Sequence, residues 1–280
     1  MNYQKETRKQ LLSGEFLSIE LSPSLNKSLD FYLSNPIFNK ILPNITDIIV
    51  TDSPLGKYTH NPILTAAYIQ NNTGKNAIVT FAMRDKNTPY ALAEIRTAEE
   101  LKVDTYMFVT GDKTQSGKNV YEKSSTEFLK EVCIQKRSKN LNTLMFATCS
   151  NKLTDNVKKK IHKKIHNGAD AIISQPITSI EEAEILRDFI EEENNISGLD
   201  RKVSFVAGIF PVIKLSTAIF LRDNVPGAEV SPELFKLLEA GEIEKAYEYN
   251  KNIFDTLTKN NFNVHLMTAN NFELMGKLIL

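Results

Sequence analysis

The sequence of 280 residues has few cysteines, no net charge and no long apolar run. Its two cysteines, Cys133 and Cys149, are too few for the disulfide framework of a small secreted protein. Its 34 basic and 34 acidic residues cancel. Nucleic acid is therefore not expected as a partner, because phosphate binding needs a net positive face. No stretch reaches the roughly 20 apolar residues of a membrane-spanning helix. The N-terminus, MNYQKETRKQLLSGEF, is polar and lacks the apolar run of a secretion signal. These features predict a cytoplasmic protein that does not cross a membrane.

Short, β-rich apolar runs alternate along the chain with segments of helical periodicity. Eight strands are predicted, over Phe16–Leu21, Asp47–Thr51, Ala77–Ala82, Thr105–Val109, Thr143–Ala147, Ala171–Ser174, Ser204–Ala207 and Val264–Met267. Helices are predicted over Leu25–Leu42, Ile63–Asn71, Tyr90–Leu101, Thr126–Arg137, Asp155–Asn167, Ile180–Asn195 and Phe272–Leu280, with two or three more in a long excursion over Leu215–Asn260. Strict alternation predicts a parallel sheet that is buried on both faces, and eight repeats predict its closure. Because no Pro- or Gly/Ser-rich linker divides the chain, we expect residues 1–280 to form one α/β domain, a (β/α)8 TIM barrel.

The segment Asp155–Asn167 illustrates the predicted helices. Val157, Ile161 and Ile165 recur every four residues and are expected to face the sheet. The lysines of the same segment are expected to cover the outside; they are Lys158, Lys159, Lys160, Lys163 and Lys164. Such a run is usually a solvated helix face.

The segments that follow the strands of such a barrel meet at one mouth, so their polar residues are candidates for chemistry. Glu20 lies inside the first strand, between Ile19 and Leu21. The later strands end in polar residues, namely Thr51 and Asp52, Arg84 and Asp85, Thr110 to Asp112, Thr148 to Ser150, and Ser174 and Gln175. Carboxylates, an amide and hydroxyls converge there without a histidine. This set suits proton transfer and hydrogen bonding to a heterocycle better than it suits a metal.

The histidines offer one spacing of interest. His162 and His166 are four residues apart on a predicted helix, a spacing that can bind zinc. No third ligand is visible nearby in the sequence, so no metal site is predicted. His60 and His265 are single residues without an assigned role. Cys149 falls where the mouth is expected, although a buried, unreactive thiol is the preferred interpretation.

Six segments, in order and spacing, resemble the methylenetetrahydrofolate reductase family over residues 14 to 280. They read VTDSPLG, LTAAYIQNNTGKNAIVTFAMRDKN, FVTGD, NGADAIISQPI, VAGIFPV and FLRDNVPGAEVSPELF. The resemblance implies a flavin-containing (β/α)8 barrel. NADH or NADPH would reduce the flavin, which would be FAD, with FMN as the alternative. The flavin would then pass hydride to a folate-bound one-carbon unit, converting 5,10-methylenetetrahydrofolate to 5-methyltetrahydrofolate.

The resemblance also implies roles for particular residues. Glu20 matches the family's general acid, which protonates a folate nitrogen and so opens the five-membered ring. Asp112 matches an aspartate near the flavin and the pterin, and Gln175 matches a glutamine that contacts the pterin or the nicotinamide. Further flavin contacts are implied at the positions of Thr51, Asp52, Thr80, Thr110, Gly111, Asp112, Thr148, Lys163 and Lys164, of which the two lysines would lie at the phosphates. A substrate contact is implied at the position of Asn271.

The chain departs from the family's pattern at three places. Thr80 stands where the family often has histidine or glutamine. Thr148, Cys149 and Ser150 replace an aromatic-Pro-Glu stretch that helps to hold the adenosine end of the flavin. Asn271 stands where the family carries an arginine for the folate's glutamate tail. Two alternatives therefore stay open: a related flavin barrel with a substrate other than folate, and a non-catalytic subunit that has lost cofactor binding. A homo-oligomer or a partner subunit is compatible with either.

Each candidate also has a purely structural interpretation. Glu20 could pair with a lysine inside the barrel, because a buried unpaired charge is costly. Asp112, after a glycine, could cap a loop. Gln175 could be a barrel amide whose hydrogen bonds are already satisfied.

Overall fold

Eight parallel strands close into a barrel, as the sequence predicted. The structure is a computed structural model and describes residues 3–114, 116–139, 143–225 and 229–280. The strands are β1 (Leu17–Leu21), β2 (Asp47–Val50), β3 (Asn76–Ala82), β4 (Thr105–Val109), β5 (Leu144–Cys149), β6 (Ala171–Ser174), β7 (Ser204–Ile209) and β8 (Asn263–Leu266). Each strand pairs with the next along the chain, and β8 returns to pair with β1. The predicted strand boundaries are correct to within about two residues.

The barrel has two apolar layers. The inner layer fills the barrel with side chains such as Phe16, Ile49, Phe146 and Val206. The outer, larger layer lies between the strands and the surrounding helices. Because side chains alternate between the two faces of a strand, Glu20 lies on the same inner face of β1 as Phe16.

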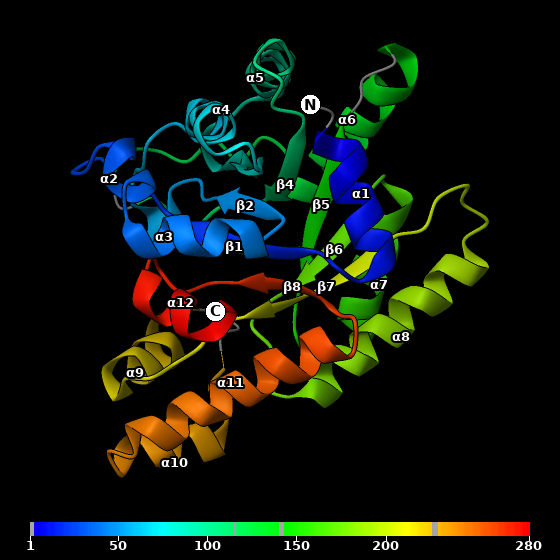
Figure 1. Cartoon of the computed structure of the whole chain (residues 1–280). Helices are drawn as coiled ribbons and strands as arrows, with labels where there is room; N and C mark the ends of the chain where they lie inside the picture. The colour runs from blue at the N-terminus through cyan, green and yellow to red at the C-terminus, as the bar shows by residue number, and fades with distance from the viewer. Residues whose placement is uncertain (1–2, 115, 140–142, 226–228) are drawn as a thin grey trace.

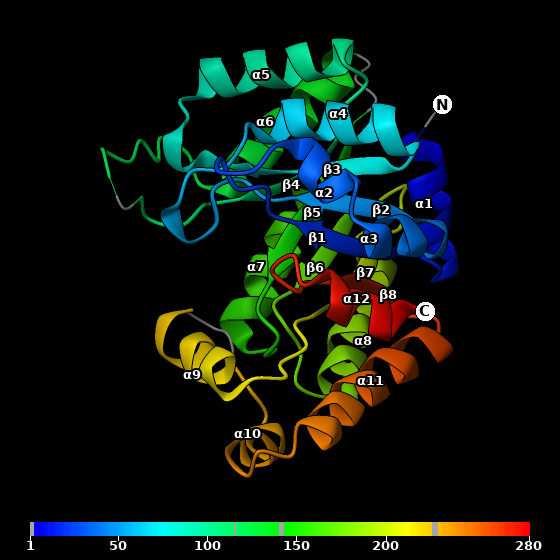
Figure 2. The same cartoon turned by 60° about the vertical axis from the view of Figure 1, so that its left-hand side comes forward.

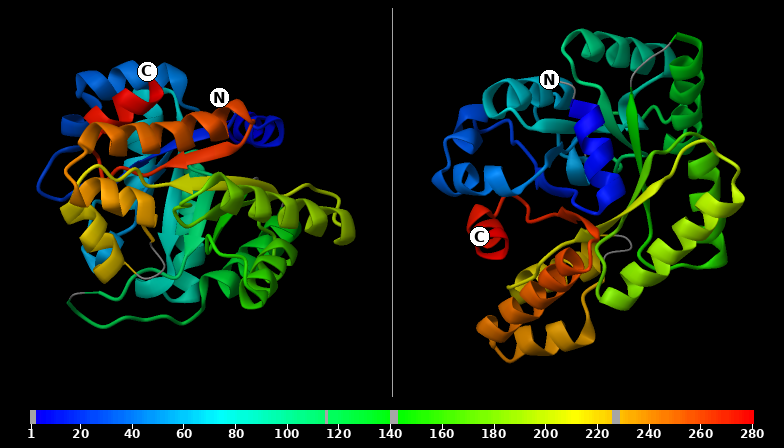
Figure 3. Two further views of the ribbon diagram at one scale, coloured as in Figure 1. Left: turned by 90° about the horizontal axis from the view of Figure 1, so that it is seen from below. Right: turned by 45° about the vertical axis from the view of Figure 1, so that its right-hand side comes forward.

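A ring of helices surrounds the strands (Figure 1), and Figure 3 shows the same ring from two further directions. The helices are α1 (Tyr3–Ser13), α2 (Leu29–Leu33), α3 (Pro36–Ile41), α4 (Pro62–Thr73), α5 (Thr88–Glu100), α6 (Ser125–Lys139), α7 (Asp155–His166), α8 (Ile180–Ile196), α9 (Leu215–Asn224), α10 (Pro232–Glu239), α11 (Ile243–Lys259) and α12 (Phe272–Ile279). Short 3-10 turns in the described residues, η1 (Leu42–Asn44), η2 (Pro54–Gly56) and η3 (Met83–Asp85), lie between strands and helices. In the described part of the chain, no helix combines the length and the apolar character needed to cross a membrane.

The helices at the N-terminal end differ from the prediction in two ways. The single helix predicted over Leu25–Leu42 is two short helices, α2 and α3, capped by the side chains of Ser28 and Asn35. Pro36 explains the break, because a proline disfavours the helical conformation of the residue before it. Helix α1 was not predicted, since its sequence is mostly polar. Figure 1 shows it on the opposite side of the barrel from α2.

The long excursion before β8 holds three described helices, which agrees with the prediction. Helices α9, α10 and α11 share a small apolar cluster of their own, which includes Leu221, Leu234 and Ala246. Figure 2 shows α9 and α10 gathered at one side of the barrel. Residues 226–228 of this excursion lie outside the described part, and with them the middle of the segment FLRDNVPGAEVSPELF.

Helix α7 confirms one part of its prediction and corrects another. Ile161 and Ile165 are fully buried against the barrel, as their spacing predicted. Lys164, however, is not on the outer face. It is half-buried, and its ammonium donates a hydrogen bond to the carbonyl of Thr148 on β5. A long lysine side chain can cover an apolar wall and still place its ammonium on a backbone acceptor.

Candidate active site

The main candidates lie at one end of the barrel. Glu20 is the fourth residue of β1, Thr51 directly follows β2, Asp112 follows β4, and Gln175 directly follows β6. Because all eight strands are parallel, these four positions share the carboxyl-terminal mouth.

Glu20 is a carboxyl group enclosed by the barrel wall. Burial raises its pKa from 4.5 to about 7, and a hydrogen bond from the Ser22 side chain opposes this only in part. A fraction of its surface remains accessible at the mouth. No lysine or arginine in the described part of the chain forms an ion pair with Glu20, so the alternative of a barrel salt bridge is not supported. A carboxyl group of this kind can hold a proton near neutral pH and release it to a bound molecule.

Asp47, at the other end of the barrel, shows how a structural carboxylate differs. Its Oδ1 accepts hydrogen bonds of 2.7 Å from the Thr7 hydroxyl and of 2.7 Å from the Asn76 amide. Burial raises its pKa to about 6 against these donors. Asp47 therefore belongs to a network that fixes α1 under the barrel, whereas Glu20 has one hydroxyl partner and faces the mouth.

Two further groups at the mouth lack protein partners. The hydroxyl of Thr80 on β3 is buried and has no hydrogen bond within the described residues. The side-chain amide of Gln175 is half-buried and likewise has no partner there, although its backbone N–H donates to the Cys149 carbonyl at 2.7 Å. The alternative of a satisfied barrel amide is therefore not supported for Gln175. Buried polar groups without partners are uncommon, and at the mouth a bound ligand would supply the missing partner.

Ser22 and Asn270 connect the segments at the mouth, and neither was among the sequence candidates. The Thr51 hydroxyl donates to the Ser22 hydroxyl at 2.9 Å. The Asn270 amide donates to the Ser22 carbonyl at 2.7 Å and accepts from its N–H at 2.9 Å. Glu20 and Thr51 are thus joined through one serine. Asn270 has a φ of 63°, in the left-handed region that asparagine tolerates better than most residues. The signal available in the sequence was therefore an asparagine in the segment that follows the last strand.

Asp52 and Arg84 hold the loops at the rim. An oxygen of Asp52 accepts from the Ala82 N–H at 3.1 Å and lies 3.4 Å from the Lys86 ammonium. The Arg84 guanidinium is completely buried. It pairs with Asp85 and donates to the carbonyl of Asp112 at 3.0 Å. The loops after β2, β3 and β4 are therefore cross-linked by charged groups.

The residues after β4 also contact their neighbours. The Asp112 carboxylate accepts a 2.7 Å hydrogen bond from the Leu55 N–H, so it holds the loop after β2. Gly111 has a φ of 85°, and a Cβ there would lie 2.9 Å from the Ala82 Cβ. The Thr110 hydroxyl lies 3.4 Å from that of Ser125. Asp112 therefore holds a loop, as its structural interpretation predicted, and its carboxylate lies at the rim of the mouth.

The residues expected at the flavin phosphates lie elsewhere on the barrel wall. The Lys164 ammonium bonds to the Thr148 carbonyl and lies beside Cys149, in the layer between strands and helices. Lys163 is exposed on α7. Cys149 is buried, and burial raises the pKa of its thiol to about 12, which makes it unreactive.

Asn271 caps a helix at the edge of a hollow. Its side chain accepts from the Leu274 N–H at 3.1 Å and so begins α12. The hollow measures about 500 Å³ and lies between the segments that follow β1 and β8. Lys27 also lines it, with its ammonium 3.8 Å from the ring centroid of Phe31. The hollow is large enough for part of a small molecule and contains one cation.

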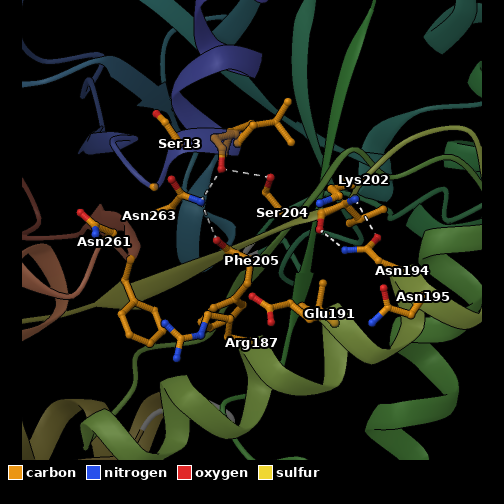
Figure 4. Close-up of a pocket in the computed structure, with 16 residues that line it drawn as sticks. Ser13, Arg187, Glu191, Asn194, Asn195, Lys202, Ser204, Phe205, Asn261 and Asn263 are labelled. Carbon is orange, nitrogen blue, oxygen red and sulfur yellow. Dashed lines mark hydrogen bonds between the residues drawn. The ribbon is translucent and has the colours of Figure 1, made fainter.

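A second hollow, of about 420 Å³, lies at the amino-terminal end of the barrel between α1, α8 and the starts of β7 and β8 (Figure 4). Much of its polar lining is already paired. The Ser204 hydroxyl and the Asn263 amide both donate to the Leu11 carbonyl, and Asn194 exchanges two hydrogen bonds with Val203. None of the sequence candidates lies there, so the mouth remains the candidate site.

The mouth fits one end of a flavin better than the other. The Thr80 hydroxyl and the Gln175 amide, which have no partner among the described residues, suit the polar edge of a flat heterocycle. The two lysines expected at the phosphates do not fit in this arrangement, because the Lys164 ammonium bonds to the Thr148 carbonyl behind the barrel wall. The residues present thus leave polar groups free at the mouth for a heterocycle, while the Lys164 ammonium is already bound to the protein.

The fold and the site together define the class of this protein, a closed (β/α)8 barrel with a protonatable carboxyl group at its mouth. A sequence profile described as methylenetetrahydrofolate reductase matches residues 15–279. The chain therefore belongs to the methylenetetrahydrofolate reductase family, as the six segments indicated. A search among curated proteins returned no match.

Solved structures confirm the fold. An uncharacterized protein from Clostridium thermocellum that binds two copies of 5-methyl-5,6,7,8-tetrahydrofolic acid superposes with a TM-score of 0.67 at 13% identity, covering 98% of this chain and 97% of that one. Oxaloacetate acetylhydrolase superposes with a TM-score of 0.56 at 10% identity, over 97% and 82%. 2,3-Dimethylmalate lyase, of the PEP mutase/isocitrate lyase superfamily, gives 0.54 at 11%, over 98% and 80%. At these identities the likeness concerns the fold alone.

Proposed function

We propose that this protein binds a reduced folate at the barrel mouth and reduces 5,10-methylenetetrahydrofolate to 5-methyltetrahydrofolate, with Glu20 as the proton donor. The observation that carries the proposal is the position of Glu20, a barrel carboxyl group with a pKa of about 7 and no cationic partner in the described chain. Family membership and a structural neighbour that binds 5-methyltetrahydrofolic acid support the same substrate class.

The proton from Glu20 would go to one of the two folate nitrogens that share the methylene carbon. The bond between that nitrogen and the methylene carbon breaks, and the carbon becomes part of an iminium cation on the other nitrogen. A hydride then adds to this carbon and gives the methyl group. Glu20 is left as a carboxylate and recovers a proton from water at the mouth. A pKa near the working pH suits both steps.

Other residues at the mouth would orient the substrate. The free amide of Gln175 and the free hydroxyl of Thr80 can hydrogen-bond to the edge of the pterin. The charge of Asp112 would favour the developing cation, even though one of its oxygens holds the Leu55 N–H. In the hollow that contains Asn271, Lys27 supplies the cation that the glutamate tail needs.

The hydride would come from NADH or NADPH. The family resemblance adds a flavin, FAD or FMN, which carries hydride between the nicotinamide and the folate when bound. Thr51, Asp52, Thr110, Gly111 and Thr148 are the proposed contacts around it. The visible absorption bands of oxidised flavin in the purified protein would reveal it directly.

A second candidate is a folate-binding barrel that does not use a flavin. The contact between the Lys164 ammonium and the Thr148 carbonyl favours it, because it removes one expected phosphate ligand. Purified protein that binds 5-methyltetrahydrofolate but takes up neither FAD nor FMN would support this candidate over the first.

Folate binding at the mouth can be tested with a matched pair of variants. Thr80→Val removes a buried hydroxyl without a partner at the mouth, and Thr143→Val removes one at the opposite end of the barrel, before β5. Both changes keep the side-chain shape, so we expect little loss of stability from either. In calorimetric titrations, Thr80→Val should weaken 5-methyltetrahydrofolate binding by roughly tenfold, and Thr143→Val should not change it. Equal binding by both variants, or no binding by wild type, would contradict the proposed site.

A further inference from the structure

A cluster of side chains that can bind a metal lies on the outer surface of the barrel, in the last turns of helices α7 and α8. Helices α7 and α8 are neighbours in the ring (Figure 1). His162 and His166 occupy successive turns of α7, and Glu193 lies in the last turn of α8. The sequence offered no third ligand beside the two histidines. Glu193 is 31 positions from His162, and only the packing of the two helices reveals it.

The three side chains already converge. His162 Nδ1 lies 2.7 Å from Glu193 Oε2. The two imidazole rings lie with their centroids 4.2 Å apart and their planes at 44°. One ligand atom from each of the three residues lies within 4.8 Å of the others. Tetrahedral zinc with bonds of about 2.0–2.1 Å needs its ligand atoms roughly 3.3 Å apart, so small rotations of exposed imidazoles suffice.

We propose that His162, His166 and Glu193 bind a zinc ion that clasps α7 to α8. Two imidazoles and a carboxylate are a common zinc ligand set, which leaves a fourth position for water. Both histidines are exposed, whereas Glu193 is only 6% exposed. The nearly buried Glu193 carboxylate would be the fixed ligand, and the two exposed imidazoles can rotate to meet the ion.

The position of the cluster indicates what the ion would do. Helix α7 follows β5 and runs back antiparallel to it, so its last turns lie toward the amino-terminal end of the barrel, away from the mouth. Residues at that end of a (β/α)8 barrel generally serve stability, whereas catalysis takes place at the mouth. The ion would therefore stabilise the packing of α7 on α8 without entering the reaction.

A simple ion pair between His162 and Glu193 is the alternative, and His166 separates the two explanations. In the ion-pair explanation His166 has no role, and its replacement changes nothing. In the zinc explanation it is a ligand. Because His166 is exposed at the end of α7, His166→Ala should fold normally. His60→Ala, which replaces a half-buried histidine remote in sequence from the cluster, is the control.

The test is calorimetric titration of the chelator-treated full chain with Zn²⁺, together with the melting temperature with and without the ion. Wild type and His60→Ala should each bind one Zn²⁺ and melt at a higher temperature with it. His166→Ala and Glu193→Gln should bind at least roughly tenfold more weakly and lose the thermal shift. Equal affinity of His166→Ala and wild type, or the lack of any one-to-one binding by wild type, would overturn the proposal.

Discussion

Replacing Glu20 by glutamine should change how the stability of the protein depends on pH. The pKa of Glu20 is raised from 4.5 to about 7 by burial, so the folded state holds its proton more tightly than the unfolded state does. The stabilising effect of that proton is complete below about pH 4.5 and is lost as the pH rises through 7. Glu20→Gln cannot ionise and keeps the side chain's size, so it should not show this loss.

The magnitude follows from the size of the shift. A pKa that moves from 4.5 to about 7 corresponds to about 3 kcal/mol of folding free energy, most of it lost between about pH 5 and pH 8. Because part of the side chain reaches water at the mouth, we expect about 2 kcal/mol over this range. Asp47 and Asp104, whose pKa values are also raised to about 6 by burial, contribute equally to both proteins and cancel in the difference.

The assay is urea unfolding of wild type and Glu20→Gln at several pH values, compared at each pH. The free energy of unfolding of the variant should rise relative to wild type by about 2 kcal/mol from about pH 5 to pH 8. Glu184→Gln, an exposed glutamate on α8, is the control and should show no such trend. A difference between wild type and Glu20→Gln that stays constant with pH would refute the argument that Glu20 is a protonated acid near neutrality.

Three further predictions concern the frame of the site. Arg84→Lys should destabilise the fold by about 3 kcal/mol in urea unfolding, since lysine cannot contact Asp85 and a loop carbonyl together from a fully buried position. Asn271→Ala removes the cap of α12 and should cost about 1 kcal/mol in the same assay. Lys164→Ala should cost about 1–3 kcal/mol, and Lys163→Ala no more than about 0.5 kcal/mol, because only Lys164 holds the Thr148 carbonyl. Equal effects of the two lysine variants, or an Arg84→Lys variant as stable as wild type, would contradict these assignments.

The barrel could be predicted from the sequence because its signal is periodic and repeated. Strands such as Asp47–Val50 and Ala171–Ser174 are buried on both faces, and the sequence shows their apolar residues, 48–50 and 171–173, as unbroken runs. The error at α2 and α3 came from extending a helical pattern through Asn35 and Pro36, where local backbone preference overrides periodicity. Helix α1 was not predicted because only Thr7 and Leu11 are buried, at the amino-terminal end of the barrel. The rest of the helix is largely polar and shows no apolar periodicity.

The site was predictable only where it follows strand ends. Residues such as Glu20 and Gln175 are found by counting along a strand, since the topology then fixes the end at which they lie. The sequence could not show which polar groups already form hydrogen bonds within the protein. Asp112 and Asn271 were expected to be ligand contacts, and the structure shows each of them also holding a backbone N–H. Glu193 could not be paired with His162 at all before the helices were packed.

The measurement that tests the central claim most directly is the reduction of 5,10-methylenetetrahydrofolate by wild type and by Glu20→Gln, followed as formation of 5-methyltetrahydrofolate with NADH or NADPH as reductant. Wild type should turn over, and the variant should be slower by roughly 10²–10⁴. Binding of 5-methyltetrahydrofolate should be nearly unchanged, because glutamine lacks the acidic proton of Glu20 but keeps the size and shape of its side chain. A Glu20→Gln variant that reduces the folate at the wild-type rate, or a wild-type protein that binds the folate and never reduces it, would contradict the account.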